Sequence, residues 1–397
     1  MRVPDSSAPY PFRPYPFKQF VLKIHSRCDL ACDYCYVYTM ADQRWRGRPN
    51  VMPAGTVEQT ARRIAEHAAA HELPAVDVIL HGGEPLLAGA DRIAHCAATM
   101  RAAVPPGVEV RIRLQTNGML LDRELIELLG ELRVRVGVSL DGDREANDRH
   151  RRRANGAGSY STVRRALLEL NRGAGRELFS GLLCTIDLQN DPVATYESLL
   201  EFEPPAVDFL LPHGNWSQPP PGRVPGSPRT PYGEWLIAVF ERWYGAAVRE
   251  TRVRIFEEIM SLLLGGRSAV EGYGLGPATC VVVQTDGAIE QSDMLASAFE
   301  GASATGLHVD RNSFDEALRS PGIAARQSGA AALSAQCREC ALLRVCGGGL
   351  YWHRYRAGSG FANPSVYCPD LYRLISHCRD RLAGDVAALR AAGSGRR

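Results

Sequence analysis

Two groups of closely spaced cysteines near opposite ends of the chain most limit what this sequence can fold into. They are Cys28, Cys32 and Cys35, in the spacing C-x3-C-x2-C, and Cys337, Cys340 and Cys346, in the spacing C-x2-C-x5-C. The chain has eleven cysteines in 397 residues, and an odd number cannot pair completely into disulfides. We therefore expect metal or cluster ligands, or small buried hydrophobic residues, rather than a disulfide framework.

The charge and hydropathy of the chain limit its surroundings and its partners. The N-terminus lacks the apolar segment of a secretory signal, and no stretch approaches about 18 uninterrupted apolar residues. We expect a soluble cytoplasmic protein with no membrane partner, in a compartment where thiols stay reduced. With 46 Lys and Arg against 44 Asp and Glu, the formal net charge of +2 gives no strong field for a polyanion, so nucleic acid is not an expected partner.

Between the two cysteine groups the sequence alternates between strand and helix patterns. Apolar runs typical of strands cover residues 20–24, 76–80, 108–114, 134–140, 179–186 and 207–211. Helical patterns cover residues 57–71, 93–104, 122–132, 161–171 and 195–201. Polar and glycine-rich residues recur where the strands end, which favours a parallel β/α sheet or partial barrel with its site at that edge.

After residue 212 the pattern changes. Residues 218–231 are rich in Pro, Gly and Ser and are expected to form a loop, followed by helices over 232–249 and 254–264. From Cys280 onward we expect a short-stranded, glycine-rich domain held by a metal centre, with a frayed tail over residues 391–397. The predicted division is 1–215 for the barrel, 216–270 for a linker with bridging helices and 271–397 for the cluster-bearing domain.

The first cysteine group allows two kinds of metal site. A structural zinc ion needs four ligands, so it would recruit a fourth residue such as His25. Three thiolates alone suit a [4Fe–4S] cluster in which one iron lacks a protein ligand and stays open to substrate chemistry.

This group resembles the cluster motif of the radical S-adenosylmethionine (SAM) superfamily, C-x3-C-x-aromatic-C, with Tyr34 as the aromatic residue. It also lies just after the first predicted strand, as in that family. The resemblance implies that the open iron binds the amino and carboxylate groups of SAM. It further implies that one electron from the cluster cleaves SAM to methionine and a 5′-deoxyadenosyl radical.

Three later motifs at predicted strand ends resemble the same superfamily. They are Gly82-Gly83-Glu84-Pro85, Gln115-Thr116-Asn117-Gly118 and Ser139-Leu140-Asp141-Gly142. Residues 147–151 resemble an HDxxR element with Asn in place of His, which leaves Arg151 as the candidate for the SAM carboxylate. Singly, each motif is typical of a turn or a solvated face; their order behind the cysteines favours the resemblance. The SAM-binding residues it implies are Tyr34, Gly82, Gly83, Glu84, Pro85, Gln115, Asn117, Ser139 and Arg151.

The second cysteine group resembles the SPASM extension of peptide-modifying radical SAM enzymes, which carries seven cysteines for two auxiliary [4Fe–4S] clusters. Cys280 fits the first position of that pattern, but Ser292 and Leu350 stand where two further ligands are expected. The resemblance therefore implies one complete auxiliary [4Fe–4S] cluster, or zinc as the alternative, on Cys337, Cys340, Cys346 and Cys368. Cys96, Cys184 and Cys378 are expected to be core thiols, with Cys378 a rival for the fourth position.

The resemblance along the chain implies an α/β fold. It is expected to be a partial (β/α)6 TIM-like barrel with a C-terminal SPASM-like iron–sulfur domain. Residues 11–23, 35–38, 286–287 and 346–351 further resemble the FxsB-type maturases. That resemblance implies a carbon–carbon crosslink (cyclophane) between an aromatic ring carbon and the Cβ of a nearby residue. The expected partners are a ribosomally made precursor peptide and an external one-electron reductant of flavodoxin or ferredoxin type. Asp293, directly after the vacant position 292, is the candidate base, or else an ordinary turn residue.

Other outcomes stay open at the level of sequence. The same pattern is compatible with thioether crosslinking or with formylglycine-generating sulfatase maturation. A non-catalytic iron–sulfur or zinc scaffold that only binds peptide is a further alternative, although intact SAM motifs argue against it.

Overall fold

The computed structural model describes residues 14–268 and 270–394, and its centre is a curved sheet of parallel strands. Six of these strands follow one another in space and in sequence. They are β1 (Gln19–His25), β2 (Ala75–Gly82), β3 (Glu109–Thr116), β4 (Val134–Ser139), β5 (Phe179–Thr185) and β6 (Ala206–Leu210). All their pairings are parallel, so their carboxyl ends meet at one edge.

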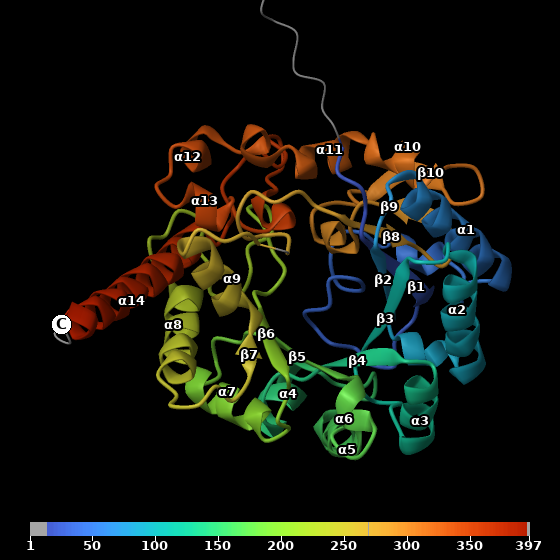
Figure 1. Ribbon diagram of the computed structural model, residues 1–397, viewed down its shortest axis with the longest axis horizontal. Helices are drawn as coiled ribbons and strands as arrows, with labels where there is room; N and C mark the ends of the chain where they lie inside the picture. The colour runs from blue at the N-terminus through green and yellow to red at the C-terminus, as the bar shows by residue number, and fades with distance from the viewer. Residues whose placement is uncertain (1–13, 269, 395–397) are drawn as a thin grey trace, which may run out of the picture.

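Helices cover the outer side of this sheet, as Figure 1 shows. They are α1 (Ala54–Ala70), α2 (Ala90–Ala103), α3 (Arg123–Glu131), α5 (Tyr160–Leu170) and α7 (Pro192–Leu200), with short α4 (Arg144–His150) and α6 (Gly175–Leu178) between them. Parallel neighbours need a crossover of this kind. The predicted α/β fold is confirmed.

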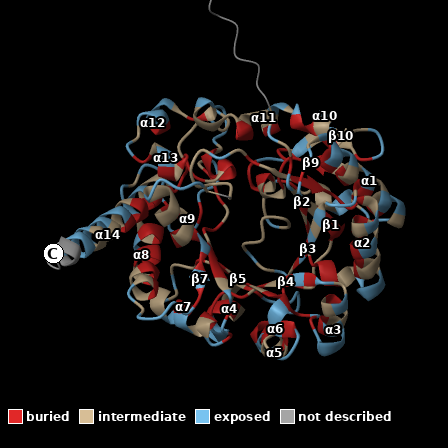
Figure 2. Cartoon of the chain, in the orientation of Figure 1, coloured by how far each residue is buried: buried red, intermediate tan, exposed pale blue. Residues whose placement is uncertain are grey.

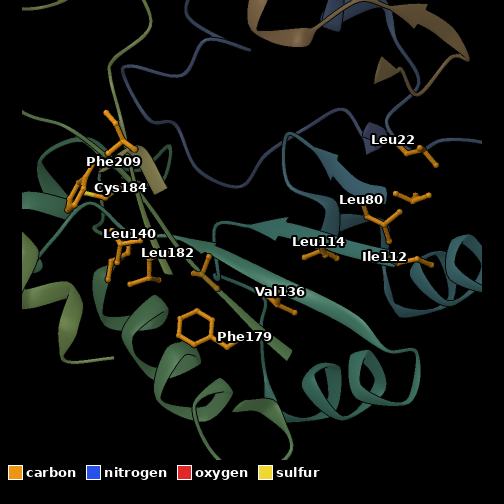
Figure 3. Packing of buried hydrophobic residues seen from close by; sticks show 14 of the residues in the cluster. Leu22, Leu80, Ile112, Leu114, Val136, Leu140, Phe179, Leu182, Cys184 and Phe209 are labelled. Carbon is orange, nitrogen blue, oxygen red and sulfur yellow. The ribbon is translucent and has the colours of Figure 1, made fainter. Parts of the chain in front are cut away.

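The alternation of side chains along each strand separates the core from the inner face. Leu22, Leu80, Leu114 and Val136 are essentially buried, and Figure 3 shows them among the apolar side chains of the sheet. Figure 2 shows buried residues on the strands and on the helix faces turned toward them. Because successive side chains point to opposite faces, the residues next to them point inward. The inner face therefore receives Lys23, His81, Gln115 and Ser139.

The sheet continues into the C-terminal part of the chain. Strand β8 (Cys280–Val283) pairs in parallel with the free edge of β1, from Gln19 opposite Cys280 to Leu22 opposite Val283. Strands β9 (Ala288–Glu290) and β10 (Ala304–His308) follow in antiparallel pairing, and β7 (Arg252–Val253) extends the other end beside β6. Hydrogen bonds thus join the two ends of the chain into one ten-stranded sheet. The predicted boundaries at residues 215 and 270 stay predictions.

The C-terminal part is more helical than the sequence analysis predicted. After α8 (Pro231–Tyr244) and α9 (Arg254–Leu263), it holds α10 (Phe314–Leu318), α11 (Pro321–Gln327), α12 (Ala335–Arg338), α13 (Leu343–Cys346) and α14 (Cys368–Ser394). The prediction of a frayed tail from Ala391 onward is wrong for residues 391–394, because α14 continues to Ser394. The apolar face of α14 consists of Leu371, Leu374, Ile375 and Cys378. Their spacing is typical of a helix, and the sequence analysis did not use it.

Helix α14 is 27 residues long and projects from the body of the protein in Figure 1. Across residues 14–268 and 270–394, no helix has both the length and the apolar character needed to cross a membrane.

A buried histidine ties the N-terminal segment to both parts of the chain. The Phe17 N–H donates to His67 Nε2 at 2.9 Å, and His67 Nδ1 and His71 Nε2 lie 2.6 and 2.8 Å from the same oxygen of Asp315. Because His67 Nε2 accepts a hydrogen bond, the ring proton belongs on Nδ1, where it donates to Asp315. A metal ion on Nδ1 would have to displace that proton, so we interpret the group as a hydrogen-bonded clamp.

Because of this clamp, we expect the free energy of unfolding to fall as the pH drops below about 6.5. Burial lowers the pKa of His67. Burial alone would raise the pKa of Asp315, but hydrogen bonding from His71 and the charge and hydrogen bond of His67 lower it. Both groups therefore bind more protons in the unfolded chain. The contribution of His67 is lost as the pH falls below about 6.5, and that of Asp315 only below about 4. We expect the melting temperature to drop between pH 7.5 and 5.5, as measured by circular dichroism.

The His67→Gln variant is compared with the unmodified protein. Its amide can replace the hydrogen bonds of His67 to Phe17 and Asp315, but it does not titrate. The drop should be smaller in this variant. His377→Gln is the matched control because His377 also pairs with a carboxylate, that of Glu241, outside the clamp. An equal drop in all three proteins would contradict the prediction.

Candidate active site and cofactor sites

The first three cysteines lie in the loop that leaves the carboxyl end of β1. Together with residues from the ends of the neighbouring strands they line a cavity of about 190 Å³. The loop is held by backbone hydrogen bonds from Cys35 N–H to the Cys32 carbonyl and from Tyr38 N–H to the Cys35 carbonyl, each 3.2 Å long. The fold thus gathers Cys28, Cys32 and Cys35 around one space.

The spacing of these thiols suits a cluster better than a single metal ion. Zn–S bonds of about 2.3 Å hold the thiolates of one zinc ion within about 4 Å of one another. In the part of the chain that the structure describes, three ligand atoms lie within 4.8 Å of one another only at His67, His71 and Asp315. Cys28, Cys32 and Cys35 are not gathered that closely, and the cavity of about 190 Å³ that they line leaves room for a larger group than one metal ion.

Burial keeps these thiols protonated unless a cation is present. It raises the pKa of Cys28 to about 12 and that of Cys32 to about 11, although Arg151 lowers the latter. Only the thiolate is a metal ligand, and a bound metal deprotonates it. The donor set therefore fits iron, which would supply the missing positive charge.

Most of the predicted SAM-binding residues line the same cavity. These are Tyr34, Gly83, Gln115, Asn117, Ser139 and Arg151. The Gln115 amide donates to the Ser139 hydroxyl at 3.0 Å, which joins the ends of β3 and β4. The Asn117 amide donates to Asp29 at 2.7 Å and lies 3.6 Å from the Cys28 sulfur.

Arg151 is held at this cavity by an aromatic residue of the cysteine motif. Its guanidinium donates to the Tyr34 hydroxyl at 2.9 Å, and that hydroxyl donates to the buried Asp141 carboxylate. Arg151 is 7% exposed, and its Nε has no hydrogen-bond partner. A buried guanidinium with a free donor suits an anionic group such as a carboxylate.

The four residues of the Gly82–Pro85 motif divide between two tasks. Gly83 lines the cavity, and a side chain there would collide with Tyr38 and the backbone of Arg27. Glu84 instead accepts hydrogen bonds at 2.7–2.9 Å, and burial raises its pKa to about 7. Its donors are the Leu86 N–H, the Thr116 hydroxyl and the Asn117 N–H. Gly82 packs on His25 and Pro85 begins a 3-10 helix, so Gly82, Glu84 and Pro85 shape the cavity from behind.

Asp293 lies beside this cavity rather than in its lining. It is mostly buried, with 12% of its side chain exposed, at the start of a 3-10 helix after β9, where its carboxylate pairs with the Lys23 ammonium and accepts a hydrogen bond from the Tyr36 hydroxyl at 2.7 Å. Burial alone would raise its pKa, but the charges of Lys23 and His81 and the hydrogen bonds from Lys23 and Tyr36 hold the pKa well below its usual range. Tyr36 lines the cavity and thus connects it to Asp293.

The sequence analysis missed the partners of Asp293. Lys23 Nζ lies 3.3 Å from His81 Nδ1, across the register that pairs β1 with β2. The available signals were a single lysine inside an apolar strand and a histidine directly before Gly82.

A larger groove of about 780 Å³ adjoins the cysteine cavity and shares Tyr34, Thr185 and His213 with it. The His213 ring lies 4.4 Å from that of Tyr36 and 6.1 Å from that of Trp352. Burial lowers the pKa of His213 to about 4, so the ring is neutral near pH 7. The three rings form an aromatic wall, which was also missed because its members are far apart in sequence.

The second cysteine group lines a separate cavity of about 290 Å³. Its members are Cys337 in α12, Cys340 in the turn that follows, Cys346 at the end of α13 and Cys368 at the start of α14. Cys378 does not line this cavity; it is buried on α14, where burial and Glu241 raise its pKa to about 12. Cys96 and Cys184 are fully buried in the core.

Cys280 lies at the start of β8 with other neighbours. Burial raises its pKa to about 12, and the opposing charge is that of Arg326. Arg326 pairs with Glu271, at 2.9 Å from its Nε. Cys280 therefore lies near a buried ion pair rather than near other cysteines. This agrees with the presence of Ser292 and Leu350 where the other ligands of an inner cluster are expected.

Comparisons with known proteins agree with this arrangement. Residues 22–191 match the family model described as Radical SAM superfamily. A cysteine-type anaerobic sulfatase-maturating enzyme of Clostridium perfringens is 27% identical over 275 residues, which are 68% of this chain and 72% of that protein. A serine-type anaerobic sulfatase-maturating enzyme of Klebsiella aerogenes is 25% identical over 371 residues, 88% of this chain and 82% of that protein.

Two solved structures share the fold. Native anSMEcpe with bound AdoMet superposes with a TM-score of 0.77 at 20% identity, over 94% of this chain and 99% of that one. Streptococcus suis SuiB bound to its precursor peptide SuiA superposes with a TM-score of 0.56 at 14% identity, over 89% of this chain and 76% of that one. Residues 22–191 are thus similar to the radical SAM superfamily, and the cofactors that fit the cysteine cavity are a [4Fe–4S] cluster and S-adenosylmethionine.

Proposed function

We propose that this enzyme forms a carbon–carbon crosslink in a ribosomally made peptide, between an aromatic ring carbon and the Cβ of a nearby residue. The observation that carries the proposal is the junction at His213, where a groove of about 780 Å³ adjoins the cysteine cavity beside an aromatic wall. An aromatic side chain entering from the groove would meet the rings of Tyr36 and His213, which line the cavity, with Trp352 buried behind His213. Aromatic rings pair favourably with one another at such distances.

The residues of the cysteine cavity divide the work of holding the cofactors. Cys28, Cys32 and Cys35 would hold the cluster, and Arg151 would receive the carboxylate of SAM. When bound, the cluster and SAM supply a 5′-deoxyadenosyl radical that removes a hydrogen atom from Cβ. Tyr34 and Asp141 keep the Arg151 guanidinium in place, so that the cofactor is oriented before the peptide arrives.

Asp293 is the proposed base for the last step. A ring that has gained a carbon substituent must lose one proton and one electron to become aromatic again. Asp293 is ionised because Lys23 faces it, and Tyr36 links it to the cavity by a hydrogen bond. The protein can therefore accept the proton at a carboxylate that is deprotonated at neutral pH. The auxiliary cluster on Cys337, Cys340, Cys346 and Cys368 would supply the electron acceptor.

Relatives of the same fold support a peptide as the substrate class. One solved anSMEcpe structure contains bound AdoMet together with the Cp18Cys peptide, and SuiB was solved bound to SuiA. We extend this to the groove of the present chain. We also propose that the reaction takes place in the cytoplasm, where thiols stay reduced, with a flavodoxin or ferredoxin as the electron source.

A second candidate is the oxidation of a serine or cysteine side chain to formylglycine. The similarity to anaerobic sulfatase-maturating enzymes over 68–88% of the chain favours it. The same cavity and base would serve, because that reaction also begins with loss of hydrogen from Cβ. The two candidates differ in the product, which carries an aldehyde in one case and a ring in the other.

Mass spectrometry of a peptide encoded beside this gene and co-expressed with the enzyme tests the proposal. We expect a loss of two hydrogens per crosslink, missing fragment ions between the joined residues, and no labelling by an aminooxy probe. An aminooxy adduct would instead identify formylglycine. Cys28→Ala is the control that should leave the peptide unmodified, since it removes a cluster ligand.

Asp293→Asn tests the base. Asparagine keeps the shape but cannot accept the proton, so crosslinked product should fall by about 100-fold or more. Cleavage of SAM to 5′-deoxyadenosine should continue, as measured by liquid chromatography of both products. Asp286→Asn serves as the matched control, because Asp286 lies in the same segment and is more exposed. Undiminished crosslinking in Asp293→Asn would exclude Asp293 as the base.

Iron analysis tests the two cluster sites. The reconstituted protein should contain roughly eight iron atoms per chain, and replacing either Cys28, Cys32 and Cys35 or Cys337, Cys340 and Cys346 by alanine should remove about four. Cys280→Ala should change nothing, since Cys280 faces an ion pair. About twelve iron atoms in the unmodified protein would contradict a single auxiliary cluster.

A further inference from the structure

A buried arginine lies beside the second cysteine group without a carboxylate partner. Arg354 ends the 3-10 helix Tyr351–Arg354 and is 8% exposed. Its guanidinium donates to the carbonyls of Gly347, Gly348 and Gly349 at 2.8, 3.0 and 2.5 Å. These acceptors are neutral, and the guanidinium also lies over the Tyr351 ring at 5.7 Å, so no anion is bound directly to this charge.

Other buried arginines differ in this respect. They are Arg151, which reaches Asp141 through the Tyr34 hydroxyl, Arg223, which lies 3.4 Å from Asp370, and Arg326, which pairs with Glu271. No salt bridge joins Arg354 to a carboxylate of residues 14–268 or 270–394. An unpaired buried charge is costly, so this site calls for an anion.

The groups whose charge acts most strongly on Arg354 are, in order, Cys337, Cys346 and Glu271, and Glu271 is already paired with Arg326. Burial lowers the pKa of Arg354, and the strongest opposing influences are Cys337 and Cys346. Gly348 lines the cysteine cavity, and a Cβ atom there would lie 3.2 Å from the central carbon of the guanidinium. Its φ of 80° also favours glycine, so this residue allows the charge to approach the cavity wall closely.

We propose that Arg354 is the buried counter-charge of the auxiliary cluster held by Cys337, Cys340, Cys346 and Cys368, and that it raises the reduction potential of that cluster. Four thiolates around a [4Fe–4S]2+ core give a net charge of about −2, which becomes about −3 on reduction. A fixed positive charge in a low-dielectric surrounding stabilises the more negative state.

This inference rests on the proposed function only for the origin of the electron. The substrate ring would lose one electron and one proton; the electron would reduce the core from 2+ to 1+, and the proton would go to Asp293. Arg354 neither gives nor takes a group in this step. It is a positioning residue that makes the cluster a better electron acceptor.

The test is a redox titration followed by electron paramagnetic resonance, without SAM or peptide. The full chain with Cys28, Cys32 and Cys35 replaced by alanine isolates the auxiliary cluster. In that background Arg354→Gln should shift the midpoint potential to more negative values. Arg354→Lys, which keeps the charge, should shift it less. Arg344→Gln is the matched control, because Arg344 is exposed two residues before Cys346 and its charge is screened by solvent.

If Arg354→Gln does not retain the auxiliary cluster, the iron content per chain is the second measurement. If Arg354→Gln loses about four iron atoms while Arg354→Lys keeps them, the charge is needed to hold the cluster, which supports the proposal. Equal loss in both variants would show a role of shape and overturn it. The proposal would also be overturned if the midpoint potential of the cluster were the same with Arg354→Gln as with Arg354 unchanged. None of these outcomes depends on which peptide product is formed.

Discussion

The parallel hydrogen bonding of β1 to two neighbours is the constraint on which the rest of the structure depends. On one side β2 places His81 opposite Lys23, and on the other side β8 leads into the segment that carries Asp293. The same strand ends in the loop of the first cysteine group. The first cysteine group, a candidate base and the joint between the two parts of the chain are thus all positioned by one strand in the middle of the sheet.

Compensation of buried charge is the second theme of the molecule. Lys23 faces Asp293, Arg326 faces Glu271 and Arg223 faces Asp370, each in a region shielded from water. Such pairs add little net stability, because desolvation offsets their attraction, but they fix geometry when both partners are present. The thiols follow the same logic, since burial disfavours their charged form until iron is bound.

Sequence patterns were sufficient for the parts of the protein that depend on local spacing. The six strands, their helices and the meeting of Cys28, Gln115 and Ser139 at one edge followed from hydrophobic periodicity and from the rule that parallel strands end together, whereas Arg151 followed only from the resemblance to a known motif. The roles of Lys23, His213 and Arg354 did not follow. Each depends on a neighbour far away in the chain, and a single charged or aromatic residue carries no signal of which neighbour that is. Helix α14 was missed for a different reason, because cysteines and glycines before it dominated the interpretation of that region.

The joining of β1 to β8 also affects how the protein is made. A ribosome delivers residues 19–25 early and residues 280–283 only after most of the chain has emerged. Until then the strand that organises the site has one unpaired edge, and contacts of such long sequence separation form slowly. Partly synthesised chains therefore expose an edge that can pair with strands of other chains. Loading of iron at Cys28, Cys32 and Cys35 before the edge is covered would link cluster assembly to the last stage of folding.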